Sequence, residues 1–224
     1  NDKAGALYPA KVAEAVSQYR ADVGISLDGD ADRVVMVDDK GHIVNGDHIL
    51  AICALHLKER GQLPKNTVVS TQMSNFGLDK LMNENGIKVV RTDVGDKHVV
   101  EEMRKNGYCL GGEQSGHIIF LDHSTTGDGC IAALNVLAVM KQSGQTLSEL
   151  NEKMEDVPQV LINTRVRNRV ELDSIKGYDA LIADIEKKLK GVGRLFVRFS
   201  GTEPVVRVLV EGPDRMAISK YAED

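Results

Sequence analysis

Aromatic residues are scarce in this sequence of 224 residues: tryptophan is absent, and Phe, Trp and Tyr together make up 4%. The net charge is −5, and lysine and arginine are interspersed with acidic residues rather than gathered in a stripe. Few rings are therefore available to stack on bases, and no basic stripe is available to neutralise a phosphate backbone. We expect no nucleic-acid partner.

Long hydrophobic runs are also missing. No apolar stretch approaches the roughly 20 residues that a bilayer-spanning helix needs, so we expect no membrane partner. Cysteine is rare, and Cys53, Cys109 and Cys130 are widely spaced within apolar stretches. This usage predicts buried, reduced thiols rather than a disulfide frame or a zinc site, and it favours a cytoplasmic protein.

Short apolar runs alternate with longer amphipathic segments along the chain, which predicts an α/β fold with a largely parallel sheet. We expect strands near residues 23–27, 34–37, 67–70, 88–91, 109–112, 160–166, 194–199 and 205–210. We expect helices from Pro9 and from Gly46, and near residues 78–85, 98–106, 127–142, 146–154 and 174–189.

The order of these segments predicts three domains. Residues 1–44 would be the end of one α/β domain, residues 45–156 one complete αβα domain with a mixed sheet, and residues 157–224 a smaller α+β domain that is incomplete at its end. Asp156, Val157 and Pro158 form a plausible linker between the last two domains.

Three carboxylates, Asp28, Asp30 and Asp32, stand on alternate residues directly after the apolar run 23–27. Oxygens converging at this spacing suit a hard divalent cation such as Mg²⁺. A solvated acidic turn is the alternative, because Asp and Gly are common in turns. A strand follows on the other side, so we expect the loop at a sheet edge rather than on a free hairpin tip.

The run Leu27-Asp28-Gly29-Asp30-Ala31-Asp32-Arg33 resembles the metal-binding loop of the alpha-D-phosphohexomutase superfamily. Residues 112–117 (Gly-Glu-Gln-Ser-Gly-His) resemble its sugar-recognition loop, and residues 198–204 (Arg-Phe-Ser-Gly-Thr-Glu-Pro) resemble its phosphate-binding loop, in the same order. Residues 73–78, 92–97 and 125–129 look most like the bacterial phosphoglucosamine mutase branch.

The resemblance implies roles for the charged residues. Asp28, Asp30 and Asp32 would hold Mg²⁺, and Arg33 would add positive charge beside the transferring phosphate, although an ion pair with the same carboxylates weighs equally. Ala31 stands where the family more commonly has Gly, and its methyl group should be tolerated if the residue keeps a negative φ.

The substrate would be a sugar phosphate. By resemblance, Glu113 and Ser115 would contact the 3- and 4-hydroxyls of the ring. A guanidinium, hydroxyls and free backbone N–H groups can wrap a phosphate dianion. Four residues of the third motif offer these groups: Arg198, Ser200, Gly201 and Thr202. Arg207 would join them or form an edge-strand ion pair.

Lys97 and His117 are two further candidates near the site. Lys97 stands where many members have Arg, so it would keep the charge near the phosphate without the bidentate fork. Asp96 could cap a helix there. His117 begins a strand, where a structural role is commoner than a catalytic one.

The resemblance implies a phosphohexomutase, an intramolecular phosphotransferase that works through a phosphoserine and a bisphosphate intermediate. The family carries that serine in a Thr-Gly-x-Ser-His-Asn-Pro type segment, which these residues lack, so the chain looks truncated at its front and should be inactive alone. A phosphomannomutase or phosphoglucomutase, and a non-catalytic sugar-phosphate-binding fragment, remain open. A haloacid-dehalogenase-type phosphatase fits poorly, because Gly-Thr typically follows its Asp-x-Asp. A homodimer is possible.

Overall fold

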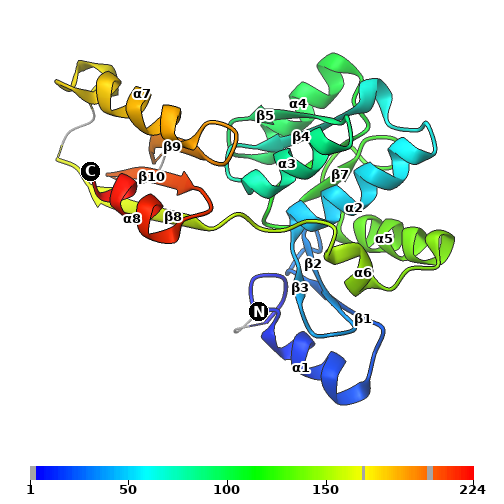
Figure 1. Ribbon diagram of the computed structural model, residues 1–224. Helices are drawn as coiled ribbons and strands as arrows, with labels where there is room; N and C mark the ends of the chain where they lie inside the picture. Colours follow the sequence, from blue (N-terminus) through cyan, green and yellow to red (C-terminus); the bar gives the residue numbers. More distant parts are fainter. Residues whose placement is uncertain (1–3, 168–169, 201–203) are drawn as a thin grey trace. The chain divides into compact units, whose positions relative to one another are not determined.

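The computed structural model describes residues 4–167, 170–200 and 204–224. The chain divides into two compact units, Asn1–Glu155 and Asp156–Asp224. Figure 1 shows the elements of both, coloured along the sequence. The predicted α/β class is confirmed, since both units combine helices with sheets.

The first unit begins with a helix and a small antiparallel sheet of strand order β1-β2-β3. These elements are α1 (Ala10–Tyr19), β1 (Val23–Leu27), β2 (Val34–Asp38) and β3 (Ile43–Val44). Leu27 pairs with Val34, so residues 28–33 form the connection of a β1–β2 hairpin. The expected sheet-edge position is therefore wrong, because the two strands pair with each other rather than entering a larger sheet separately.

The remainder of this unit is built on a mixed sheet of strand order β5-β4-β6-β7, in which β4 is parallel to β5 and β6, and β7 is antiparallel to β6. Its strands are β4 (Thr67–Thr71), β5 (Lys88–Thr92), β6 (Leu110–Gly112) and β7 (Ile118–Phe120). Its helices are α2 (Gly46–Glu59), α3 (Phe76–Glu84), α4 (Asp96–Asn106), α5 (Gly129–Ser143) and α6 (Leu147–Asn151), with a short 3-10 turn η1 (Pro64–Asn66).

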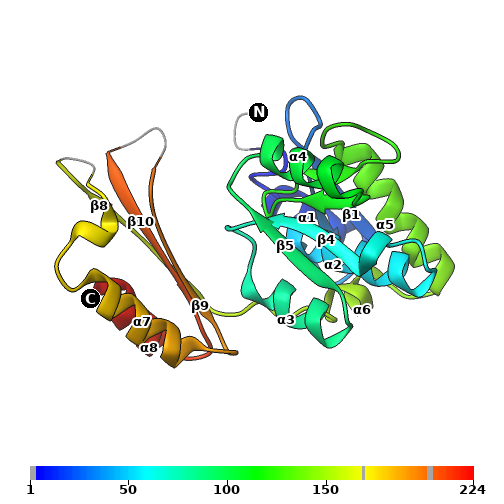
Figure 2. The ribbon, with the colours of Figure 1, turned by 90° about the horizontal axis from the view of Figure 1, so that it is seen from above.

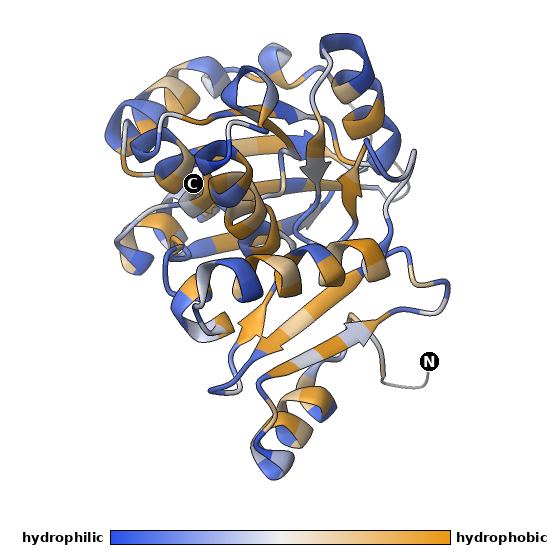
Figure 3. Cartoon of the chain, turned by 90° about the vertical axis from the view of Figure 1, so that its right-hand side faces the viewer, coloured by the Kyte–Doolittle hydropathy of each residue, from blue (hydrophilic) through white to orange (hydrophobic). Residues whose placement is uncertain are grey.

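Both faces of the mixed sheet are buried, because successive residues of a strand point to opposite faces. Val68 of β4 lies in the larger core with α2, α3 and α5, whereas Val69 lies in a smaller core with Val99 and Met103 of α4. Val34 and Met36 of β2 belong to the larger core, so the N-terminal hairpin packs into the same unit. In Figure 3 the hydrophobic colour gathers on the strands and on the helix surfaces that face them.

Local signals set several helix ends as predicted. Gly107 and Gly144 end α4 and α5 in the left-handed conformation, which glycine adopts without strain. Thr146 and Glu149 form the predicted capping box at the start of α6, with both reciprocal hydrogen bonds present.

The second unit is a three-stranded antiparallel sheet of order β8-β10-β9, with α7 and α8 together on one face (Figure 2). Its elements are β8 (Gln159–Arg165), η2 (Leu172–Ser174), α7 (Tyr178–Leu189), β9 (Arg194–Phe199), β10 (Val205–Glu211) and α8 (Arg215–Glu223). The helix expected from Ser174 begins only at Tyr178, because Gly177 has a φ of 87°. The sequence analysis missed α8, whose signal is the N-cap Asp214.

The cysteines are not all buried as predicted. Cys53 and Cys109 are buried, and burial raises the pKa of Cys53 to about 12 and that of Cys109 to about 11. Cys130 is exposed, because the buried face of α5 is formed by Ala132, Ala133, Val136 and Val139. Within the described ranges, no helix has the length and apolar character needed to cross a bilayer.

Candidate functional site

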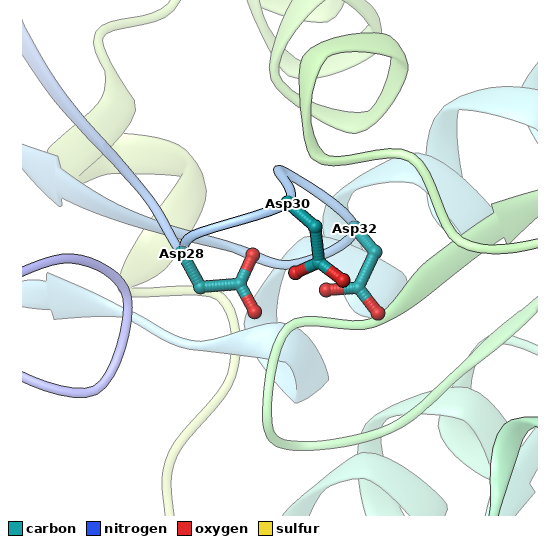
Figure 4. Close-up of side chains that lie close together, drawn as sticks. All are labelled: Asp28, Asp30 and Asp32. Atoms are coloured by element: carbon teal, nitrogen blue, oxygen red, sulfur yellow. The ribbon is translucent and has the colours of Figure 1, made fainter. Parts of the chain in front are cut away.

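The three predicted metal ligands converge in the β1–β2 connection. Asp28, Asp30 and Asp32 each offer one carboxylate oxygen, and these oxygens all lie within 4.8 Å of one another. Figure 4 shows the three side chains turned to one side of the loop. Asp30 is exposed, and the other two are partly buried. The choice between a metal site and a solvated acidic turn stays a prediction.

Ala31 gives this loop its shape, and its conformation corrects an expectation. Its φ is +59°, in the left-handed region, rather than negative. The Ala31 N–H donates to the Asp28 carbonyl at 3.3 Å, and the Asp28 N–H donates to the Arg33 carbonyl at 3.4 Å. The chain reverses within these few residues, and Ala31 adopts the left-handed conformation in the reversal.

Arg33 lies beside the carboxylates. Its Nε is 3.5 Å from Asp28 Oδ2 and 3.8 Å from Asp32 Oδ1, and its side chain is 38% exposed. The ion pair weighed from the sequence is therefore present. It compensates part of the negative charge and leaves the guanidinium accessible to a ligand.

Among the three aspartates, Asp32 has the environment best suited to a cation. Burial raises the pKa of this carboxyl, and the nearby Asp28 and Asp30 raise it further. Its Oδ1 atom is buried and has no hydrogen-bond partner among the described residues. A buried acceptor without a donor is costly, and a bound divalent cation would remove that cost. The three aspartates therefore fit a hard cation.

The predicted sugar loop is the β6–β7 turn. The Gly116 N–H donates to the Glu113 carbonyl at 3.0 Å, and one oxygen of the partly buried Glu113 side chain accepts from the Gly95 N–H at 3.0 Å. Gly116 has a φ of +93°, and an added Cβ would lie 2.1 Å from the Val34 carbonyl oxygen. Ser115 is partly buried in the same turn. The turn is thus packed tightly against the start of β2.

His117 joins the sugar loop to the metal loop. It is 5% exposed, and its Nδ1 lies 3.0 Å from Asp32 Oδ2. Its Nε2 accepts from the Gly127 N–H at 3.0 Å and lies 3.7 Å from Asp96 Oδ2. The sequence analysis gave His117 no partner, since its only local signal was the adjoining Gly-Glu-x-Ser-Gly run.

Lys97 is exposed in the first turn of α4. The N-cap of that helix is Gly95, so Asp96 lies inside the first turn and is not the cap that the sequence suggested. Gly95 can hold the φ of 123° found there, which Asp rarely adopts. Lys97 thus follows Gly95 by two residues, and the Gly95 N–H donates to the Glu113 carboxylate.

The second unit holds the predicted phosphate residues. Arg198 of β9 and Arg207 of β10 are directly opposite in the sheet, and the Ser200 N–H donates to the Val205 carbonyl at 2.9 Å. Ser200 is buried. Within the described part of the chain, the buried Nε of Arg198 has no hydrogen-bond partner. Gly201 and Thr202 lie outside the described residues.

Two opposed arginines on one face are an unusual pairing, because like charges directly across a ladder destabilise it. Arg207 lies on the central strand of this sheet, opposite Asn163 on one side and Arg198 on the other, so the expected edge-strand position is wrong. The anion-binding role of the arginine pair stays a prediction.

Family models match both units. The model for phosphoglucomutase/phosphomannomutase, alpha/beta/alpha domain III, matches residues 45–157, and the model for the C-terminal domain of that family matches residues 161–224. The chain belongs to this family.

Curated relatives agree in name. Phosphoglucosamine mutase of Bdellovibrio bacteriovorus is 72% identical over 224 residues, which cover 100% of this chain and 49% of that protein. Phosphoglucosamine mutase of Geobacter metallireducens is 54% identical over 220 residues, which cover 98% of this chain and 49% of that protein. The chain thus spans about half the length of the curated relatives it matches.

Solved structures share the fold. Aspergillus fumigatus N-acetylphosphoglucosamine mutase in complex with GlcNAc-6P and magnesium has a TM-score of 0.77 at 23% identity, covering 99% of this chain and 55% of that one. A phosphoglucomutase/phosphomannomutase family protein from Burkholderia thailandensis has a TM-score of 0.75 at 21% identity, covering 98% and 49%.

Proposed function

We propose that this chain is the portion of a phosphoglucosamine mutase that contains domain III and the C-terminal domain. The whole enzyme would interconvert glucosamine 6-phosphate and glucosamine 1-phosphate through a phosphoserine enzyme and a bisphosphate intermediate. The observation that carries this proposal is the 72% identity, over all 224 residues, to a relative of that name. The cytoplasmic location and the homodimer suggested by the sequence stay predictions, as does the assignment of residues 1–44 to a separate domain.

In this proposal Asp28, Asp30 and Asp32 hold Mg²⁺. When bound, the cation would supply positive charge to the oxygens of the phosphoryl group in transfer. The support is the convergence of three carboxylate oxygens and the buried Oδ1 of Asp32, which has no hydrogen-bond partner among the described residues. Carboxylate oxygens are the ligands that Mg²⁺ prefers.

The chain's own residues would position the sugar phosphate. Arg33 adds positive charge beside the carboxylates, and Lys97 supplies charge or a proton near the transferring phosphate. Glu113 and Ser115 orient the ring, with the Glu113 carboxylate held by the Gly95 N–H and its other oxygen available for a hydroxyl. Positioning of this kind is the main protein contribution in phosphoryl transfer.

The phosphate that is not being transferred would bind in the second unit. Arg198 and Arg207 supply charge, and Ser200, Gly201 and Thr202 supply hydroxyl and backbone donors. A bisphosphate intermediate needs two separate phosphate sites, and this chain offers one charged cluster for each. The support is the direct opposition of the two arginines in the sheet.

The serine that carries the phosphoryl group would lie outside these residues, since no Thr-Gly-x-Ser-His-Asn-Pro type segment occurs in them. Residues 1–224 alone should therefore bind sugar phosphate and Mg²⁺ without turnover. A phosphomannomutase or phosphoglucomutase would use the same residues. A non-catalytic sugar-phosphate-binding role would need only the residues that bind the sugar and its phosphate.

The test is ³¹P NMR of glucosamine 6-phosphate with Mg²⁺ and the full-length protein, run beside glucose 6-phosphate and mannose 6-phosphate. We expect the 1-phosphate of the amino sugar to form fastest. A preference for glucose or mannose would overturn the amino-sugar assignment. Turnover by residues 1–224 alone would show that the missing serine segment is not needed.

A further inference from the structure

His117 sits in a packed position between the sugar loop and the metal loop. The ring is buried, and its two nitrogens have different partners: Asp32 Oδ2 at Nδ1 and the Gly127 N–H at Nε2, each at 3.0 Å. The other group facing Nε2 is Asp96 Oδ2, at 3.7 Å.

These partners fix which nitrogen carries the proton. A backbone N–H is only a donor, so the Nε2 atom that it contacts must accept. In the neutral ring the proton is then on Nδ1, which donates it to Asp32 Oδ2. His117 thereby occupies Oδ2 of Asp32, whereas Oδ1 has no hydrogen-bond partner among the described residues and lies 3.8 Å from Arg33 Nε.

The packing leaves the ring no alternative position on the Gly127 side. A Cβ added to Gly127 would lie 2.4 Å from both Cδ2 and Nε2 of His117. A side chain of any size there would push the ring away from Asp32. Glycine is therefore needed at position 127 because the His117 ring leaves no room for a side chain, and not because of the backbone conformation there.

We propose that His117 is a positioning residue for the cation site: by holding Oδ2 of Asp32, it aims Oδ1 at the point where the three carboxylates converge. The proposal rests on the assignment of Asp28, Asp30 and Asp32 as Mg²⁺ ligands. Removing a group that holds a metal ligand in place commonly weakens metal affinity tenfold to a hundredfold.

Two substitutions separate the two hydrogen bonds. In His117→Asn, the amide N–H falls near the position of Nδ1 and can still donate to Asp32. In His117→Gln, the amide falls near the position of Nε2 and meets Gly127 instead. Gly127→Ala keeps the imidazole but displaces it. His123→Gln, on the exposed loop after β7, is the matched control.

The measurement is Mg²⁺ affinity by isothermal titration calorimetry on the protein without substrate. We expect His117→Gln and Gly127→Ala to weaken binding roughly tenfold or more, and His117→Asn and His123→Gln to stay within about threefold of the unchanged protein. Urea unfolding of each variant identifies any that fail to fold. If His117→Gln does so, the comparison of Gly127→Ala with His117→Asn decides the outcome.

Equal affinity in every folded variant would overturn this inference and leave the proposed Mg²⁺ site intact. An equal loss in His117→Asn and His117→Gln would also overturn it, because the ring would then matter only for packing. Absence of Mg²⁺ binding by the unchanged protein would instead overturn the metal part of the proposed function.

Discussion

The β9–β10 ladder contains two cross-strand pairs of long charged side chains, and the two pairs differ in sign. Arg194 is opposite Glu211, and the two form an ion pair. Four residues further along β9, Arg198 is opposite Arg207. The first pair is complementary within the fold, whereas the second places two positive charges opposite each other. The prediction that Arg198 and Arg207 bind an anion rests on this difference in sign.

The predicted metal loop, residues 28–33, gathers negative charges, whereas the arginine pair gathers positive ones. Three carboxylates converge there, and Arg33 compensates only part of their charge. In both places side chains of like charge lie close together, which costs stability where the charges are not compensated. Such sites should gain stability when a charge is removed and lose ligand affinity at the same time.

Breaking the complementary pair should have the largest effect on stability. Arg194→Ala removes an ion-pair partner of the buried Glu211 carboxylate, which we expect to cost up to about 3–5 kcal/mol of unfolding free energy in the second unit. Hydrogen exchange of the β10 amides measures this directly. The double variant Arg194→Met/Glu211→Met is the control, and it should recover much of the loss. A cost below about 1 kcal/mol would mean that the pair behaves as an exposed one.

Breaking the arginine pair should give the opposite pattern. Arg198→Ala removes the cross-strand repulsion, so β10 exchange should slow slightly or stay unchanged. Binding of glucosamine 6-phosphate should weaken about tenfold to a hundredfold, the usual loss for a hydrogen bond to a charged group. Calorimetry with Arg215→Ala, an exposed arginine at the start of α8, is the control. Stability lost without any change in affinity would contradict the assignment.

The elements and the metal-ligand candidates with local causes could be predicted from the sequence. Strand β9 has the predicted bounds, and the spacing of Asp28, Asp30 and Asp32 was enough to predict their convergence. The capping box of α6 was also readable, since its two residues lie three positions apart. Periodicity and short-range spacing carry this information.

The rest depends on contacts between distant parts of the chain. His117 meets Asp32 across 85 residues, and no local pattern encodes that distance. The opposition of Arg198 and Arg207 depends on strand register, which a shift of one residue would abolish. The helix α8 was missed for a different reason, because a single cap residue is weak without a long periodic run.

The conformation of Ala31 allows the metal loop to be altered without touching its charges. Ala31→Gly removes a left-handed φ that costs an L-residue about 1–2 kcal/mol. Glycine also gives the unfolded chain more conformational freedom, which offsets roughly 0.5–1 kcal/mol of that gain. We therefore expect a net gain of about 0.5–1 kcal/mol in urea unfolding. The matched control is Ala13→Gly within α1, which should lose about 1 kcal/mol instead.

The same variant distinguishes the effect of the loop's backbone conformation on Mg²⁺ affinity from the effect of its carboxylates. Because Ala31→Gly removes no carboxylate, Mg²⁺ affinity measured by calorimetry should stay within about twofold, in contrast to the variants at His117. A gain in stability with unchanged affinity would place the strain in the turn alone. A marked loss of affinity would mean that the alanine stiffens the loop enough to hold the three aspartates together, so that the left-handed residue serves the site despite its cost.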